Sequence, residues 1–151
     1  MKNSNEVQIL PATKTDYPQL AQIYQQSRKA TFPWVQHPEI SDFIRDSEGE
    51  YLLKAVLNQK IVGFLSFYQS ANFIHLLFID PEYMHHGVGT QLLQAIRLQA
   101  TDLVTLKCVR ENTNALAFYK AQGFKIIGRS LWRKPPYYTL KDTKKAAYPL
   151  L

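Results

Sequence analysis

The sequence predicts an α/β domain built on a mixed β-sheet, and three observations support this fold class. Segments rich in aliphatic and aromatic residues alternate with amphipathic segments in the order strand, two helices, three strands, helix, strand, helix, two strands. Some neighbouring strands are joined by short turns and others by a helix, so hairpins and crossovers share one sheet. Of the 151 residues, 46% are hydrophobic and 20% are charged, which is ordinary for a globular domain with one core.

The first part of the chain is predicted to form a strand, two helices and a hairpin. The stretch VQILPA is expected to hold a short strand that ends at Pro11. In the following segment, TDYPQLAQIYQQSRKATF, Thr15 or Asp16 is a candidate N-cap, and Pro18 lies in the first helical turn, where proline is tolerated. HPEISDFIRDSEG is expected as a shorter helix ended by Gly49, and YLLKAVL and KIVGFLSFYQ are expected to form a hairpin around NQK.

The second part of the chain is predicted to alternate strands and helices. NFIHLLFI is a strand, and a helix follows from about Gly89 to Ala100. DLVTLKCV is a strand, NTNALAFYKAQG is a helix ended by Gly123, and FKIIGRSLW and YYTLK are the last two strands. No repeat or linker divides the chain, so residues 1–151 are expected to be a single domain. Residues 141–151, which begin with a lysine-rich run, are expected to form a loose tail.

The composition excludes several classes of protein. The longest apolar runs are far shorter than the ~20 residues of a membrane-spanning helix, and the N-terminus lacks the apolar region of a signal peptide. With one cysteine, Cys108, an intrachain disulfide is impossible, so a cytoplasmic location is expected. The net charge of +6 allows an anionic cofactor, an acidic substrate or nucleic acid as a partner. No spacing of histidine and cysteine indicates a metal site.

A glycine-rich turn follows the predicted strand NFIHLLFI. In FIDPEYMHHGVGTQLL, Gly87 and Gly89 lie where the strand gives way to a helix. A helix N-terminus has unpaired amides and partial positive charge, and glycine lets the backbone approach phosphate oxygens. A valine at either glycine would then occupy the space of the phosphate. The pattern lacks the third glycine of a Rossmann turn and the Lys-Ser/Thr of a P-loop, and by itself it is more typical of a structural turn than of a phosphate site.

A second motif lies on the last predicted helix. Asn112, Ala115 and Tyr119 are spaced by three and four residues, so they share one helical face. A polar residue, a small residue and a phenol on such a stripe could hold an amide-containing ligand. The alternative is a core helix in which Asn112 is the N-cap and Tyr119 is half-buried.

Together, the two motifs resemble those of the GNAT-type N-acetyltransferase superfamily. The family's Gln/Arg-x-x-Gly-x-Gly/Ala loop corresponds to residues 84–89, and its Asn-x-x-Ala-x-x-Phe-Tyr-x-x-x-Gly-Phe motif is matched in full by residues 112–124. The order of elements extends the resemblance from about Val7 to Leu140, and it is similar to that of small bacterial members that acetylate peptide or protein amines. Met84 replaces the usual Gln or Arg and His86 the frequent Lys or Arg, which implies weaker cofactor affinity.

The resemblance implies both a fold and a cofactor site. It implies a mixed, mostly antiparallel sheet flanked by helices and splayed between the fourth and fifth strands. The pantetheine arm of acetyl-CoA would pair with the backbone of Phe78 and Ile79, and the face of Asn112, Ala115 and Tyr119 would line that arm. The pyrophosphate would bind the amides of one loop: His85, His86, Gly87, Val88, Gly89 and Thr90. No metal is implied.

The resemblance also implies catalytic roles. Tyr119 matches the family's general acid, and a phenol with the ordinary pKa of ~10 suits a departing thiolate. A backbone amide near Phe78 would stabilise the oxyanion. His75 occupies a strand position at which relatives carry a base, with Phe73 and Leu77 expected on the same face. Its alternatives as the base are Glu82, Tyr68 or water, and a purely structural role for this histidine is as well supported.

The expected function is therefore acetyl transfer from acetyl-CoA to a primary amine, by direct attack in a ternary complex. The acceptor could be a small molecule, a peptide N-terminus or a lysine. The alternative, motivated by Met84, is a CoA-binding regulatory module without catalysis. A nucleic-acid partner is disfavoured because no basic helix is present, a membrane partner is not expected, and a homodimer is compatible with the sequence. Four aromatic residues could line the acceptor pocket or belong to the core or its rim: Trp34, Trp132, Tyr137 and Tyr138.

Overall fold

The computed structural model describes residues 6–31 and 41–144, with side chains placed for 6–28 and 41–144. Its helices and strands follow the predicted order. The elements are β1 (Gln8–Pro11), η1 (Lys14–Asp16), α1 (Tyr17–Thr31), α2 (Ser41–Ser47), β2 (Tyr51–Leu57), β3 (Lys60–Tyr68), η2 (Gln69–Ala71), β4 (Phe73–Ile79), η3 (Pro81–Tyr83), α3 (Val88–Gln99), β5 (Thr105–Val109), α4 (Thr113–Ala121), β6 (Phe124–Arg129) and β7 (Tyr137–Asp142).

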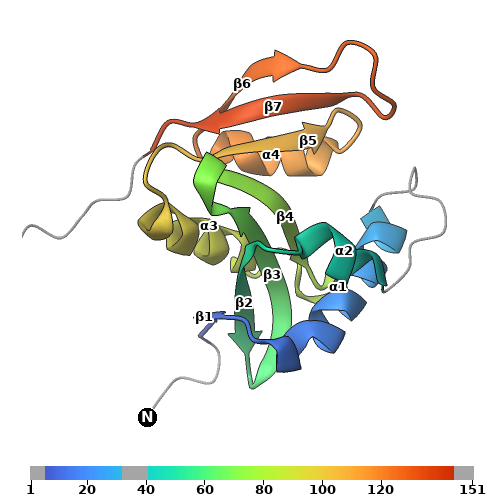
Figure 1. Cartoon of the computed structure of the whole chain (residues 1–151), viewed down its shortest axis with the longest axis vertical. Coiled ribbons are helices and arrows are strands. Elements are labelled where there is room, and N and C mark those ends of the chain that lie inside the picture. The colour runs from blue at the N-terminus through green and yellow to red at the C-terminus, as the bar shows by residue number, and fades with distance from the viewer. Residues whose placement is uncertain (1–5, 32–40, 145–151) are drawn as a thin grey trace, which may run out of the picture.

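The strands form one seven-stranded sheet in the order β1-β2-β3-β4-β5-β7-β6 (Figure 1). Every neighbouring pair is antiparallel except β4 and β5, which are parallel. The mixed, mostly antiparallel sheet implied by the sequence is therefore confirmed. The expected hairpin between β2 and β3 is also present, and its turn residues Asn58 and Gln59 both have left-handed φ angles.

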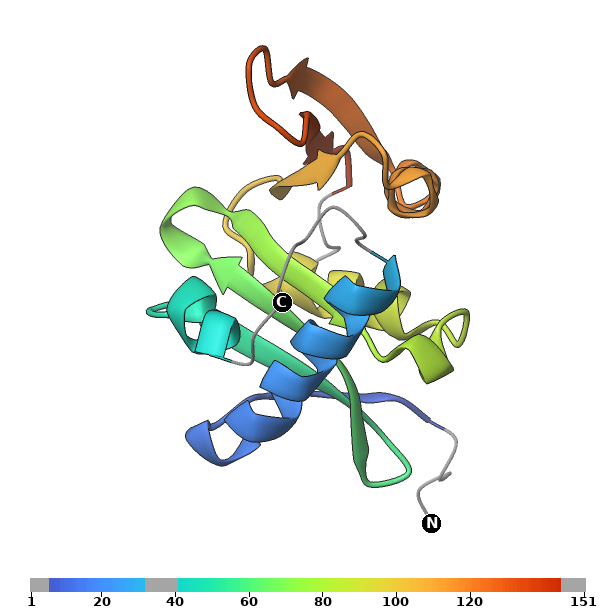
Figure 2. The same cartoon turned by 90° about the vertical axis from the view of Figure 1, so that its right-hand side faces the viewer.

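Two apolar clusters cover the two faces of the sheet. Tyr24 of α1 and Phe43 of α2 pack with Phe64 of β3 on one face, and Figure 2 looks onto α1 on this side. On the other face, Leu92 of α3 and Leu116 of α4 belong to a larger cluster of buried residues. Because β3 is buried on both faces, it is an almost continuous apolar run rather than an alternating one.

The sheet opens between β4 and β5. These strands are paired only at Phe73–Thr105 and Ile74–Leu106, near their N-terminal ends. Beyond these two pairs the strands diverge, and β5, β7, β6 and α4 form a separate unit above the gap in Figure 1. The splay implied between the fourth and fifth strands is therefore confirmed.

A buried ion pair joins the two sides of the splayed sheet. Arg97 Nε of α3 donates to Asp142 Oδ2 of β7 at 2.6 Å, and its Nη2 donates to Gln122 O at the end of α4 at 2.7 Å. The Asp142 side chain is fully buried and that of Arg97 is 10% exposed. The expectation of a loose tail from residue 141 is therefore wrong for Lys141 and Asp142, while residues 145–151 lie outside the described ranges.

At the ends of elements, two smaller expectations differ from the structure and one lies partly outside the described ranges. The first helical segment is capped by reciprocal contacts of Thr13 with Asp16, whose Oδ2 accepts from Thr13 N at 2.8 Å. The second helix is described from Ser41, and the first four residues of the segment predicted for it lie outside the described ranges. β6 ends at Arg129, so Trp132 lies in the following loop and is 93% exposed. None of the helices in the described ranges has the length and apolar character needed to span a bilayer.

We expect Asp142→Ala to lower the free energy of unfolding by about 3 kcal/mol or more, because it leaves the Arg97 guanidinium buried without its carboxylate. The control is Arg45→Ala, which removes the ion pairs of a 69% exposed arginine with Asp42 and Asp46 and should cost at most about 1 kcal/mol. Urea unfolding of both variants measures the difference. Equal, small losses would show that the pair does not hold the two parts of the sheet together.

Candidate active site

The loop between β4 and α3 has the backbone of an anion-binding turn. Asp80 Oδ1 accepts from Glu82 N at 3.0 Å and caps the short η3 helix. His85 and Gly87 both have left-handed φ angles, 67° and 78°, and Gly87 is the N-cap of α3. The amides of the first turn of α3 have no preceding helical carbonyl as a partner, and the helix dipole adds positive charge there. A Cβ on Gly87 would meet no atom within 4 Å, so the space in front of this turn is open.

The second glycine of the loop has a different role from the one expected. A Cβ on Gly89 would lie 3.0 Å from Phe118 Cζ of α4, so this glycine allows α3 and α4 to approach each other. The expectation that a side chain here would occupy phosphate space is therefore wrong, because the Cβ direction leads to α4. Val88 is buried in the core, and Thr90 Oγ1 accepts from Gln122 Nε2 at 3.0 Å. The backbone amides of these residues, rather than their side chains, are the groups that could meet an anion.

The side chains before Gly87 are exposed. Met84 is 39% exposed, and His85 and His86 are also exposed, with the His86 ring 6.0 Å from the ring of Tyr83. Within residues 6–31 and 41–144, no three His, Cys, Asp or Glu side chains gather as metal ligands would. An anion at this loop would therefore be bound mainly by backbone amides and by the helix dipole, and less by charged side chains.

Beyond Ile74, the edge of β4 that faces the gap is not paired with any strand in the described part of the chain. Asp80 N donates to Val62 O of β3, and the carbonyl of Ile79 accepts from Ser27 Oγ of α1 at 3.0 Å. Since backbone groups alternate between the two edges of a strand, Phe78 directs its amide and carbonyl toward Phe64 of β3, its register partner. Leu77 and Ile79 direct theirs toward the gap. The pantetheine arm was expected to pair with the backbone of Phe78 and Ile79. The geometry supports this role for Ile79, and it supports Leu77 in place of Phe78.

The expected stripe of Asn112, Ala115 and Tyr119 is present on α4, but its side chains already make contacts within the protein. Asn112 is the N-cap, with its Oδ1 accepting from Ala115 N at 3.2 Å, so the alternative role of this side chain is confirmed. Its amide nitrogen remains available as a donor. Ala115 packs against the larger core cluster. Tyr119 is 9% exposed, with its ring 5.3 Å from Phe118 and 5.6 Å from Phe124.

Burial changes the acid–base properties of Tyr119 and Cys108. Loss of hydration raises the pKa of Tyr119 well above the ordinary phenol value that was expected, and the neighbouring Cys108 adds a smaller effect in the same direction. The Tyr119 hydroxyl makes no hydrogen bond with the described residues. Within the same ranges, no fully buried side-chain nitrogen or oxygen lacks a partner, so this hydroxyl is not fully enclosed. Burial also raises the pKa of Cys108 to about 11, which keeps it a neutral thiol in the core.

His75 lies on β4 in contact with a carboxylate that the sequence analysis did not identify. Its Nδ1 is 2.6 Å from Glu50 Oε1, and the other oxygen of Glu50 accepts from Ser66 Oγ. The His75 side chain is 40% exposed, whereas that of Glu50 is 10% exposed. A carboxylate at Nδ1 favours the tautomer that carries a proton there, which leaves Nε2 free to accept one.

A bulge in β4 sets the direction of His75. Phe67 and Ser66 are consecutive on β3, but their register partners on β4 are Ile74 and Leu76, so His75 is the extra residue. The His75 ring is stacked with Phe73 at 6.5 Å, as expected. Leu77 does not share this face, because it packs against the cluster under α3 and α4. The strict alternation assumed for an unbroken strand fails at the bulge.

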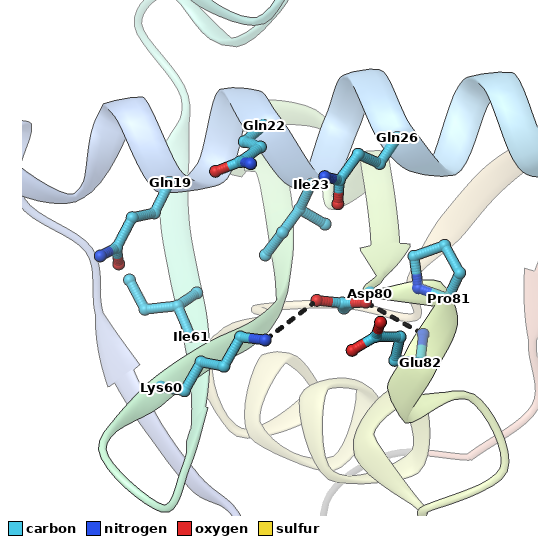
Figure 3. Close-up of a pocket in the computed structure, with 9 residues that line it drawn as sticks. All are labelled: Gln19, Gln22, Ile23, Gln26, Lys60, Ile61, Asp80, Pro81 and Glu82. Atoms are coloured by element: carbon cyan, nitrogen blue, oxygen red, sulfur yellow. Dashed lines mark hydrogen bonds and ion pairs between the residues drawn. The ribbon is translucent and has the colours of Figure 1, made fainter.

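Of the other candidate bases, neither lies beside the open edge of β4. Tyr68 is at the far end of β3, paired with Phe73, and is 51% exposed. Glu82 lines a polar cavity of about 420 Å³ between α1, η3 and the start of β3 (Figure 3). In this cavity, Lys60 Nζ is 3.8 Å from Asp80 Oδ2. No lining residue belongs to β5 or α4, so this cavity is distinct from the β4–β5 gap, and the gap with its neighbouring loop is the better candidate site.

Similar proteins are consistent with this geometry. The sequence model described as "Acetyltransferase (GNAT) family" matches residues 17–124. The peptidyl-lysine N-acetyltransferase YjaB of Salmonella typhimurium is 36% identical over 92 residues, 60% of this chain and 59% of that protein. The peptidyl-lysine N-acetyltransferase YiaC of Escherichia coli is 26% identical over 124 residues, 79% of this chain and 84% of that protein. The match thus spans about 60% of the length of YjaB and most of YiaC.

Solved structures show the same fold. The solution structure of apo-form YjaB from Escherichia coli has a TM-score of 0.76 and 26% identity, and covers 94% of this chain and 99% of that chain. The PaiA N-acetyltransferase from Thermoplasma acidophilum, solved in complex with coenzyme A, has a TM-score of 0.73 and 20% identity, with 91% and 99% covered. Because the family model matches well over half of the sequence, this chain belongs to the acetyltransferase (GNAT) family.

Proposed function

We propose that this protein is an acetyl-CoA-dependent N-acetyltransferase whose acceptor is a lysine side chain of a peptide or protein. The observation that carries the proposal is the gap between β4 and β5, with the open turn at Gly87 beside it and a buried phenol on α4. Family membership supports the reaction, and the names of the relatives YjaB and YiaC support lysine as the acceptor.

The residues present fit the cofactor. The open space at Gly87 and the first-turn amides of α3, those of Val88, Gly89 and Thr90, suit a pyrophosphate, and the amides of residues 85–87 precede them in the same loop. The unpaired edge of β4 at Leu77 and Ile79 suits an extended amide-containing arm, although Ile79 O would be shared with Ser27. Acetyl-CoA, when bound, supplies an acetyl thioester. Asn112 Nδ2 and the small Ala115 lie on the α4 side, where they would contact the same arm.

His75 is the group that we assign to the acceptor amine. A lysine amine is mostly protonated near neutral pH and must lose a proton before it can form a bond to the acetyl carbon. Glu50 holds Nδ1 of His75, so Nε2 is positioned as the acceptor of that proton. The buried Ser66–Glu50 contact fixes the carboxylate in turn. The arrangement gives a base with a defined orientation on the exposed face of β4.

Tyr119 is the group that we assign to the departing sulfur. Tyr119 would donate its hydroxyl proton to the sulfur as the carbon–sulfur bond breaks, and an amide next to Phe78, that of Leu77 or Ile79, would stabilise negative charge on the acetyl oxygen. The raised pKa of Tyr119 keeps its proton in place throughout the neutral range. The phenol is then restored by the protons released at the amine.

The first prediction tests the function itself. With acetyl-CoA and a panel of lysine peptides, we expect steady release of CoA thiol, and Tyr119→Phe should lower kcat by about tenfold or more with little change in the Kd for acetyl-CoA. Since its pKa is raised, Tyr119 should produce no basic limb in the kcat profile below about pH 10. Binding of acetyl-CoA without thiol release from any amine would instead indicate a regulatory module.

The second prediction concerns the His75–Glu50 pair. Because Nε2 of His75 is assigned to take a proton from the acceptor amine, His75→Ala should lower kcat/KM for the peptide by about tenfold or more, with little change in the Kd for acetyl-CoA. Glu50→Gln should lower kcat/KM by a smaller factor, because the carboxylate no longer orients the ring. Both parameters are measured beside melting temperatures. Unchanged kcat/KM and unchanged stability in both variants would assign the proton transfer to water, and lower stability with unchanged kcat/KM would make His75 structural.

The third prediction separates the two glycines. Asparagine tolerates a left-handed backbone, so Gly87→Asn should change the melting temperature only slightly. Its side chain would enter the open space in front of the turn, so the Kd for acetyl-CoA should rise about tenfold. Gly89→Ala should instead cost about 1–3 kcal/mol of stability through its contact with Phe118. Calorimetry and urea unfolding measure the two effects. An unchanged Kd for Gly87→Asn would remove this turn from the cofactor site.

A further inference from the structure

The charge of this protein is concentrated in one stretch of the chain. Residues 112–141 contain six lysines and arginines and no aspartate or glutamate. The rest of the chain has twelve basic and twelve acidic residues, so the whole net charge of +6 lies in this stretch. It forms α4, β6 and β7, which together with β5 make up the unit on one side of the gap.

Three lysines of this unit lie on one face of its sheet. Leu106 and Cys108 of β5 and Leu140 of β7 face the core under α4, so Lys107 and Lys141 between and beside them face away from it. Lys125 of β6 is the direct register partner of Lys141. We call Lys107, Lys125 and Lys141 the lysine face; all three are exposed. The cluster under α1 and α2 takes its strand residues from β2, β3 and β4 only, so these helices do not cover this face.

The lysines of the lysine face have no ion-pair partner among the described residues. None of its three lysines forms an ion pair within residues 6–31 and 41–144, whereas most of the ion-paired basic residues there contact a carboxylate within 3.3 Å. Like charges directly opposite each other on neighbouring strands destabilise a sheet. The opposed pair Lys125–Lys141 is therefore a local cost to the fold that an anionic partner would remove.

The lysine face is continuous with the proposed base. Lys107 Nζ lies 5.9 Å from the ring centroid of Phe73 and 5.0 Å from that of Tyr137. Phe73 is stacked with His75, which is paired with Glu50. A chain of contacts thus runs from the proposed proton acceptor on β4 across the paired ends of β4 and β5 to the lysines. A segment bound at the lysine face would lie next to the amine that His75 deprotonates.

We propose that the lysine face docks an acidic segment of the acceptor polypeptide, so that this enzyme acts on lysines with aspartate and glutamate nearby. This proposal rests on the proposed function and names its substrate class. A single-stranded nucleic acid fits less well, because sheet surfaces that bind one present free aromatic rings on which bases stack. Here the Lys107 ammonium lies over both Phe73 and Tyr137.

The test compares two peptides that have the same central lysine, one flanked by glutamates and one by glutamines. We expect wild-type kcat/KM to be about tenfold higher for the glutamate peptide at low salt, and the preference to shrink as salt screens exposed charges. In Lys125→Gln/Lys141→Gln the preference should largely vanish, with KM for acetyl-CoA unchanged and the melting temperature equal or higher. The matched control, Lys14→Gln/Lys120→Gln, removes the same charge from exposed positions outside the lysine face and should retain the preference.

A binding measurement separates failure of this proposal from failure of the proposed function. The glutamate peptide with acetyl-lysine at its centre is titrated by fluorescence anisotropy, which needs no turnover. Tighter binding by the wild type than by the Lys125/Lys141 variant supports the lysine face even if no peptide is acetylated. Turnover with equal kcat/KM for both peptides overturns the proposal while the acetyltransferase function stands. Tighter binding of single-stranded oligouridine than of the glutamate peptide also overturns it, in favour of a nucleic-acid partner.

Discussion

The early separation of β4 from β5 is the constraint on which the rest of this structure depends. After the pairs Phe73–Thr105 and Ile74–Leu106, the facing edges of the two strands find no further strand partner among residues 6–31 and 41–144. Unpaired backbone groups that are removed from water cost about 1–3 kcal/mol each, so a gap of this kind is stable only if it is wet or occupied. A sheet that continued its ladder would be more stable locally, but it would have no opening for an extended ligand.

Polar contacts at the closed end of the gap hold the two parts of the sheet at a defined separation. Asn72 accepts through its backbone carbonyl from Thr105 N at 3.0 Å and through its side chain from Thr101 N at 2.9 Å. Asp142 N donates to Val104 O, while the Asp142 carboxylate binds Arg97 on α3. These contacts lie at the ends of β4, β5 and β7. They connect the unit of β5, β7, β6 and α4 to the rest of the protein at the point where β4 and β5 begin to diverge.

The two sides of the gap differ in the environment that they give to their ionisable side chains. On the α4 side, Tyr119 and Cys108 lie in an apolar cluster that raises both of their pKa values and keeps both protonated. On the β4 side, His75 is exposed and is oriented by Glu50. The proposed proton donor therefore lies among apolar side chains, and the proposed proton acceptor lies on an exposed face of the sheet.

The sequence by itself determined the order of the elements, the turn at Gly87 and the capped helix that carries Tyr119, because periodicity, glycine spacing and caps are local properties of the chain. Only the tertiary structure decided which local pattern serves which purpose. Gly89 contacts α4, a strand bulge redirects His75, and Asp142 is buried opposite Arg97 rather than in a tail. Glu50 carried no local signal, since its meeting with His75 depends on the register of β2, β3 and β4. Contacts of this kind are fixed by packing between segments far apart in sequence, and no pattern along one segment records them.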